Sequence, residues 1–176
     1  MVLIDLRQLQ QGLPAITPAF GAALAEACAV CLTEQQHQPG VELKVTGEFT
    51  ATYQLNWPLV TAQMQRCWND LEYTTEQGAY GIALLLLGEL TEFTVVERSR
   101  KGTGFDYWLG KPGVSSDLPF QKLVRLEVSG IRKGNPSQVR TRVKLKKIQV
   151  APTDTVAPAF IVVIEFSQPI ADIATS

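Results

Sequence analysis

The chain has 176 residues, of which 45% are hydrophobic and 19% are charged, and its net charge is −1. This composition is typical of a folded globular domain and excludes a disordered or low-complexity chain. Three cysteines are too few for a disulfide framework, no apolar run is long enough to span a membrane, and the first residues lack a signal-peptide pattern, so we expect a single cytoplasmic domain without a membrane segment.

The first 73 residues predict a helix-hairpin-helix arrangement. An alanine-rich, apolar stretch indicates a buried helix, and the alternation of apolar and polar residues that follows indicates two strands. We expect this part to form an addition packed on the rest of the domain, where it shapes a substrate cleft or a homo-oligomer contact. The predicted elements are a short helix over 4–11, a helix over 20–35, a hairpin over 41–57 and a helix over 60–70.

Residues 74–166 predict six elements in the order helix, three strands, helix, strand. Thr74 or Thr75 is expected to cap the first helix. The second helix could also be read as a strand, because apolar and basic residues alternate in it, but Asn135 and Pro136 are a typical helix start and favour a helix. The predicted ranges are 74–90, 93–100, 105–110, 122–131, 138–149 and 159–166, with a loop over 112–119 and a tail over 167–176.

The charge of the chain is unevenly distributed. Residues 98–147 hold thirteen basic and three acidic residues, a net charge of +10, whereas residues 1–97 carry a net charge of −8. A basic segment inside an acidic protein is typical of a binding site for a polyanion such as nucleic acid. A solvated basic face that pairs with acidic surface elsewhere explains the same pattern equally well.

Two acids lie within apolar runs on neighbouring predicted strands. Asp106 lies in the second strand of the three and Glu127 in the third. Carboxylates in such surroundings are costly unless something compensates their charge, and a divalent metal ion is one compensation. If the two strands are adjacent, both carboxylates can bind one Mg²⁺ ion, which would activate water for cleavage of a phosphodiester.

The element order, with Asp106 on the second strand and Glu127-x-Ser129 on the third, resembles the PD-(D/E)xK nucleases, the restriction endonuclease-like superfamily. The resemblance covers about residues 74–166. It implies a mixed sheet flanked by helices, with Mg²⁺ or Mn²⁺ held by Asp106, Glu127 and Glu76, and with the Val128 carbonyl as a further ligand. The chain departs from the family at Ser129, where the family has a catalytic lysine.

The resemblance implies that another basic residue replaces that lysine. Lys144 on the helix over 138–149 is the first candidate, with Lys101 and Arg140 behind it. The same helix and the turn before the second strand are expected to bind the nucleic-acid backbone without sequence preference. The predicted contacts are Arg98, Lys101, Arg140, Lys144 and Lys147.

The function predicted from these features is that of a metal-dependent nuclease-like protein that binds or cleaves a nucleic-acid backbone. Two alternatives remain open: a non-catalytic nucleic-acid-binding protein and a protein-interaction subunit on the same fold. Cys28, Cys31, Cys67 and His37 could also form a zinc site. Buried structural cysteines are the favoured reading, because Cys28 and Cys31 lie in an apolar helix without a second closely spaced ligand pair.

Overall fold

The structure is a computed structural model that describes residues 2–113 and 123–176, and its centre is one mixed eight-stranded sheet. Neighbouring strands are parallel at β1–β3, β2–β8 and β6–β7 and antiparallel at the other four pairings. In spatial order the strands are β1 (Val2–Asp5), β3 (Ala51–Asn56), β2 (Val41–Gly47), β8 (Ile170–Thr175), β7 (Ala159–Glu165), β6 (Val124–Ile131), β5 (Tyr107–Gly110) and β4 (Thr94–Arg98).

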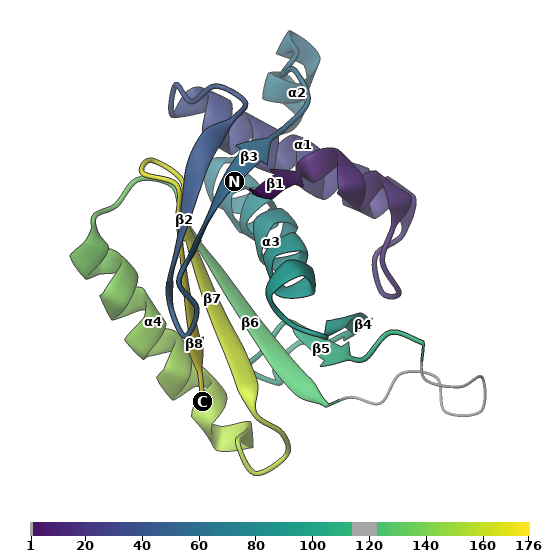
Figure 1. Cartoon of the computed structure of the whole chain (residues 1–176), viewed down its shortest axis with the longest axis vertical. Coiled ribbons are helices and arrows are strands. Elements are labelled where there is room, and N and C mark those ends of the chain that lie inside the picture. The colour runs from purple at the N-terminus through teal and green to yellow at the C-terminus, as the bar shows by residue number, and fades with distance from the viewer. Residues whose placement is uncertain (1, 114–122) are drawn as a thin grey trace.

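Helices cover both faces of this sheet, which confirms the predicted α/β class. Helices α1 (Pro18–Glu34) and α3 (Leu71–Leu90) lie on one side and α4 (Pro136–Val150) on the other (Figure 1). Alternate residues of β7 enter the two cores, so this strand is apolar from Ala159 to Ile164. The shorter helices are the 3₁₀ segments η1 (Leu6–Gln11) and η2 (Ala151–Thr153) and the six-residue α2 (Ala62–Cys67).

The predicted order of helix, three strands, helix and strand is confirmed as α3, β4, β5, β6, α4 and β7. Asn135 caps α4, since its side chain accepts the backbone N–H of Gln138, so the helical reading of this ambiguous segment is correct. The predicted cap of α3 is wrong. Asp70 caps that helix, and the Thr74 hydroxyl donates to the Asp70 carbonyl one turn inside it.

Two further predictions are corrected by the sheet. Residues 167–176 do not form a tail, because β8 lies between β2 and β7 and buries Ala171 and Ile173. Buried Glu165 stabilises the turn into β8 by accepting the backbone N–H groups of Ser167 and Gln168. At the other end of the chain, the predicted helix over 4–11 is divided between the end of β1 and η1.

Some expectations fall outside the described residues. The predicted loop over 112–119 is described only as far as residue 113, and the predicted start of the third strand at residue 122 is not described. In the ranges 2–113 and 123–176, no helix is long and apolar enough to cross a membrane.

Replacing Arg125 of β6 with alanine should lower the free energy of unfolding by about 3 kcal/mol. The side chain is fully buried, and it donates at 2.8 Å to the carbonyls of Val150 and Ala157, which would lose their buried donor. Urea unfolding measures the effect. Arg140→Ala, at an exposed arginine of α4, is the matched control and should leave stability nearly unchanged. Equal stabilities of the two variants would contradict the prediction.

Candidate functional site

The candidate site lies where β5 stops pairing with β6. The pairing of Tyr107 with Leu126 is the last between these strands, and β6 continues to Ile131 alongside β7. Helix α3 approaches the continuing part of β6 at Gly130, where a Cβ atom would lie 2.5 Å from the Thr75 carbonyl oxygen. A glycine is therefore needed for α3 to lie this close to the site.

Asp106, just before β5, is held at the edge of β6. Its Oδ2 accepts the backbone N–H of Val128 at 2.8 Å, and its Oδ1 accepts the hydroxyl of buried Tyr80 on α3 at 2.8 Å. Burial and the charge of Asp106 raise the pKa of Tyr80, so the phenol remains a hydrogen-bond donor. The carboxylate is thus oriented by two donors from different elements.

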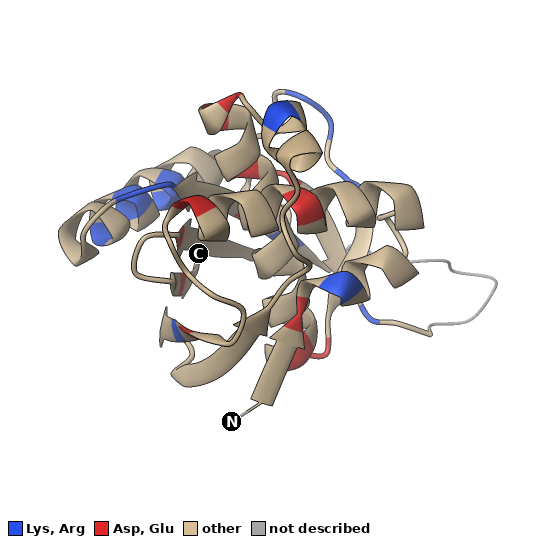
Figure 2. Cartoon of the chain, turned by 90° about the horizontal axis from the view of Figure 1, so that it is seen from above, with Lys and Arg blue, Asp and Glu red and all other residues tan. Residues whose placement is uncertain are grey.

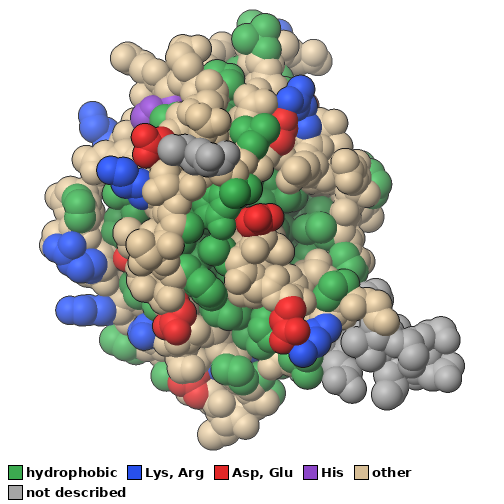
Figure 3. Space-filling model, in the orientation of Figure 1, with side chains coloured by type: hydrophobic (Ala, Val, Ile, Leu, Met, Phe, Trp, Pro, Cys, Tyr) green, Lys and Arg blue, Asp and Glu red, His purple; other side chains and the backbone are tan. Residues whose placement is uncertain are grey.

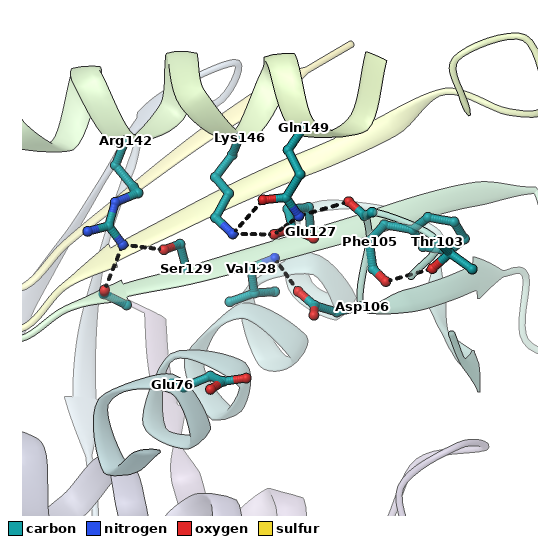
Figure 4. Close-up of polar contacts among 12 residues, drawn as sticks. Glu76, Thr103, Phe105, Asp106, Glu127, Val128, Ser129, Arg142, Lys146 and Gln149 are labelled. Atoms are coloured by element: carbon teal, nitrogen blue, oxygen red, sulfur yellow. Dashed lines mark hydrogen bonds and ion pairs between the residues drawn. The ribbon is translucent and has the colours of Figure 1, made fainter. Parts of the chain in front are cut away.

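Glu127 lies on the face of β6 that α4 covers. The Nζ atom of Lys146 is 2.6 Å from its Oε1, and the Nε2 atom of Gln149 is 3.0 Å from the same oxygen. Gln149 also donates to the Gly104 carbonyl at 3.0 Å, which joins α4 to the turn that precedes Asp106 (Figure 4). Glu127 is 2% exposed, and an acid buried this deeply requires such partners.

The electrostatics of the pair follow from this packing. Burial, followed by the negative charge of Asp106, raises the pKa of Glu127 to about 7, and the hydrogen bond and charge of Lys146 oppose the shift. Among the described contacts, the two neighbouring carboxylates share one cationic partner, Lys146 of α4. The pair is therefore short of positive charge near neutral pH. This shortage is what a bound cation would relieve.

The raised pKa of Glu127 predicts how stability depends on pH in metal-free buffer. A carboxyl group whose pKa is raised by folding binds more protons in the folded state, so its contribution to stability is lost as the pH rises between the two pKa values. For Glu127 this window extends from about 4.5 to about 7. Urea unfolding across this range should show Glu127→Gln gaining stability relative to the wild-type protein as the pH rises. Parallel curves would contradict the assignment.

Two adjoining pockets meet at the acid pair. The first has a volume of about 560 Å³ and the second about 590 Å³, and both are lined by Glu76, Tyr80, Asp106, Glu127 and Gln149. The first also has Ser129, Arg142 and Lys146 in its wall, whereas the second has Arg98, Arg100 and Lys101. A chain of phosphate groups that follows both pockets would therefore pass the acid pair with basic side chains on either side.

The structure does not bring Lys144, the first candidate for the basic residue of the site, to the acid pair. Lys144 is exposed and lines neither pocket, whereas the ammonium group of Lys146 contacts Glu127. The difference is one of helical phase. Val143 and Val150 are buried, and position 146 is one turn from each of them, so it faces the sheet.

Glu76 does not join the acid pair as a third ligand. Its Oε1 lies 3.1 Å from the Tyr80 hydroxyl, which also bonds to Asp106, so the phenol lies between the two acids. In the part of the chain that the structure describes, no group of three or more His, Cys, Asp or Glu side chains could hold a metal ion. The expected metal site of three acids is therefore not found among these residues, and Asp106 and Glu127 remain its candidates.

The five predicted nucleic-acid contacts separate into two groups. Arg98 and Lys101 line the second pocket. Arg140, Lys144 and Lys147 are exposed on α4 and line neither pocket. Figure 2 shows Lys and Arg residues along α4 on the left, and Figure 3 shows basic side chains gathered along the same edge of the surface. The outer group is thus basic surface away from the acid pair.

The donor set at the acid pair fits a hard divalent cation with few protein ligands. Mg²⁺ typically takes one or two carboxylates and keeps several waters. Among the described residues, both donors to Glu127 bind its Oε1 atom. The Oε2 atom therefore remains available to a metal ion. The Val128 carbonyl lies on the same side of β6 as its N–H, toward Asp106, and Val128 lines the first pocket.

The cysteines do not show a comparable fit to a metal ion. Cys28 and Cys31 are buried, and burial raises the pKa of both thiols, to about 11 for Cys31. Cys67 is exposed, and the ring Nε2 of His37 lies 2.9 Å from the Phe166 carbonyl oxygen. The reading of Cys28 and Cys31 as buried side chains of α1 is confirmed.

Several residues of the site were missed from sequence: Tyr80, Arg142, Lys146 and Gln149. The last three lie at spacings of four and three residues on α4, so they form one helical row beside the buried valines. That periodicity is visible in the sequence. Comparison of the chain with protein-family models, curated proteins and solved structures gave no match, so the chemistry of the site is inferred from its own geometry.

Proposed function

We propose that the chain is a metal-dependent nuclease with a restriction endonuclease-like core of the PD-(D/E)xK type. The observation that carries the proposal is the contact between Lys146 and Glu127, with Nζ 2.6 Å from Oε1, in the pocket that also holds Asp106. Two acids and one lysine are the chemical groups that the family resemblance requires. Here α4 supplies the lysine, and β6 has serine at position 129.

In this proposal Asp106 and Glu127 hold Mg²⁺ or Mn²⁺, with the Val128 carbonyl beside them. The bound ion would supply an activated water molecule and would stabilise the charge that develops on the cleaved phosphate. Lys146 places a positive charge next to Glu127, where it can stabilise the same developing charge and orient the attacking water. Tyr80 and the Val128 N–H keep the Asp106 carboxylate in one orientation.

The second pocket supports nucleic acid as the substrate class. Arg98, Arg100 and Lys101 line it, next to the acid pair, and this segment belongs to the basic region of an otherwise acidic chain. Arginine and lysine beside a phosphate path give affinity without sequence preference. The guanidinium group of Arg98 also lies 5.3 Å from the ring centre of Tyr107, which fixes its position.

The proposal predicts cleavage that depends on a divalent metal. Fluorescently labelled single-stranded DNA, duplex DNA and single-stranded RNA should be tested with Mg²⁺ and with Mn²⁺. At least one substrate should be cut, EDTA should stop the reaction, and excess metal should restore it. Salt-sensitive binding without cleavage of any substrate would instead identify a non-catalytic nucleic-acid-binding protein. Neither cleavage nor binding would reject both functions.

A further inference from the structure

Arg142 lines the first pocket but forms no ion pair with a described carboxylate. Its Nη1 lies 2.8 Å from the Ser129 hydroxyl oxygen and 3.5 Å from the Gly130 carbonyl oxygen, both neutral acceptors. Its other nitrogens bond to no described residue, and none of them is a buried atom without a partner. The guanidinium group is therefore fixed at one end and has donors available to a ligand in the pocket.

Arg142 and Lys146 form a matched pair along β6. They lie four residues apart on α4, a separation of about 6 Å along the helix axis. Their contacts on β6, Ser129 and Glu127, are two residues apart on one face of the strand, a similar distance of about 6.6 Å. Figure 4 shows both side chains extending from α4 toward β6. Successive phosphates of an extended nucleic-acid strand are separated by a comparable distance.

We propose that Arg142 forms a binding subsite for the backbone phosphate adjacent to the one that is cleaved, and that Ser129 is its positioning residue. This inference rests on the proposed nuclease function, which places the cleaved phosphate at Asp106, Glu127 and Lys146. A guanidinium group suits the role because its planar fork of N–H donors binds phosphate through two hydrogen bonds. The serine that replaces the family lysine thus orients a second cation.

The alternative to a phosphate subsite is that Arg142 only balances the negative charge of nearby acids. Glu72 and Glu76 of α3 line the same pocket, and Figure 4 shows Glu76 across the sheet from α4. They are exposed, and neither forms an ion pair with Arg142 among the described residues. A residue that only balances these acids would affect stability, but its removal would not change the response of the protein to one particular phosphate of the substrate.

The first experiment compares the kinetics of Arg142→Ala with those of Arg140→Ala, a matched control on an exposed arginine of the same helix. Loss of one charged hydrogen-bonding contact that is present before and during the reaction should raise KM roughly tenfold and leave kcat nearly unchanged. Arg142→Lys should be intermediate, because an ammonium group cannot form the two-pronged contact. Ser129→Ala should raise KM by a smaller factor. Equal KM values for Arg142→Ala and Arg140→Ala would overturn the proposal.

The second experiment identifies the phosphate. Oligonucleotides with one uncharged methylphosphonate at successive linkages are cut by the wild-type protein and by Arg142→Ala. Neutralising the linkage next to the cleaved bond should raise KM for the wild-type protein by about the factor seen for Arg142→Ala, and should have no further effect in the variant. Effects that simply add would show that Arg142 does not contact that phosphate and would overturn the proposal.

A binding measurement separates failure of this inference from failure of the nuclease function. In EDTA, fluorescence anisotropy with a labelled single strand gives the dependence of Kd on salt. Removal of one phosphate contact should reduce the logarithmic slope by about 0.7 in Arg142→Ala but not in Arg140→Ala. That result would support the subsite even if no substrate is cut, whereas equal slopes for the two variants would overturn it.

Discussion

Lys146→Ala should lower the kcat of metal-dependent cleavage about 100- to 1,000-fold, the range seen when a preorganised electrostatic group is removed from an active site. The substitution deletes the cation that lies 2.6 Å from Glu127, and among the described residues it leaves Gln149 as the remaining side-chain donor to that buried acid. Because the opposing positive charge is lost, the pKa of Glu127 should rise further. The pH dependence of cleavage should therefore shift to higher pH, which a rate profile between about pH 6 and about pH 9 would measure.

Lys144→Ala is the control for this substitution. It removes the same charge from the same helix, but Lys144 is exposed and lines neither pocket. Its kcat and pH profile should match those of the wild-type protein. If the two variants lose activity equally, general basic charge on α4 matters and the specific contact with Glu127 does not.

A relocated lysine gives a sharper test of the same geometry. Ser129 lies two residues after Glu127 on the same face of β6, so a lysine at position 129 should approach Glu127 from the strand. Adding Ser129→Lys to Lys146→Ala should restore roughly tenfold of the lost kcat, part of what a single electrostatic group contributes. Recovery is partial because the new ammonium group would lie beside Arg142, the present partner of Ser129.

The elements around the site could be predicted because their signals are local. Asn135 and Pro136 start α4, and the apolar run over 159–166 forms the buried strand β7. A tight turn at residues 101–104 indicates the pairing of β4 with β5, whereas the pairing of β5 with β6, which brings Asp106 near Glu127, has no such local signal. The central position of β8 could not be predicted either, because its pairing with β2 joins residues more than 120 positions apart. A short alternating segment at the end of a chain carries no signal for such a partner.

The identity of the lysine at the acid pair shows a different limit of prediction from sequence. Lys144, Lys146 and Lys147 are chemically alike in the sequence, and only the phase of the helix distinguishes them. The buried residues Val139, Val143 and Val150 define that phase, and they favour position 146. The role of Tyr80 is harder to foresee. It depends on the close approach of α3 to the sheet, which brings a phenol between two acids that are 30 residues apart in the chain.

Asp106→Asn should reduce cleavage more than 1,000-fold, because it removes one of the two carboxylates proposed to hold the metal ion. The fold should be retained. An asparagine oxygen can still accept the Val128 N–H, and its amide group can donate to the Tyr80 hydroxyl oxygen, which can then donate to Glu76. The loss of activity would thus reflect the missing charge at an otherwise similar site.

Two measurements independent of activity complete this prediction. Calorimetric titration with Mn²⁺ should show binding to the wild-type protein that is at least tenfold weaker in Asp106→Asn. In metal-free buffer, the pKa of Glu127 should fall in the variant, because the charge of Asp106 is one of the two causes of its rise. The loss of stability between about pH 4.5 and about pH 7 should then end at a lower pH. Unchanged Mn²⁺ affinity together with full activity would show that the metal binds elsewhere. Loss of both would tie cleavage to the acid pair, which lies beside β6 where β5 begins.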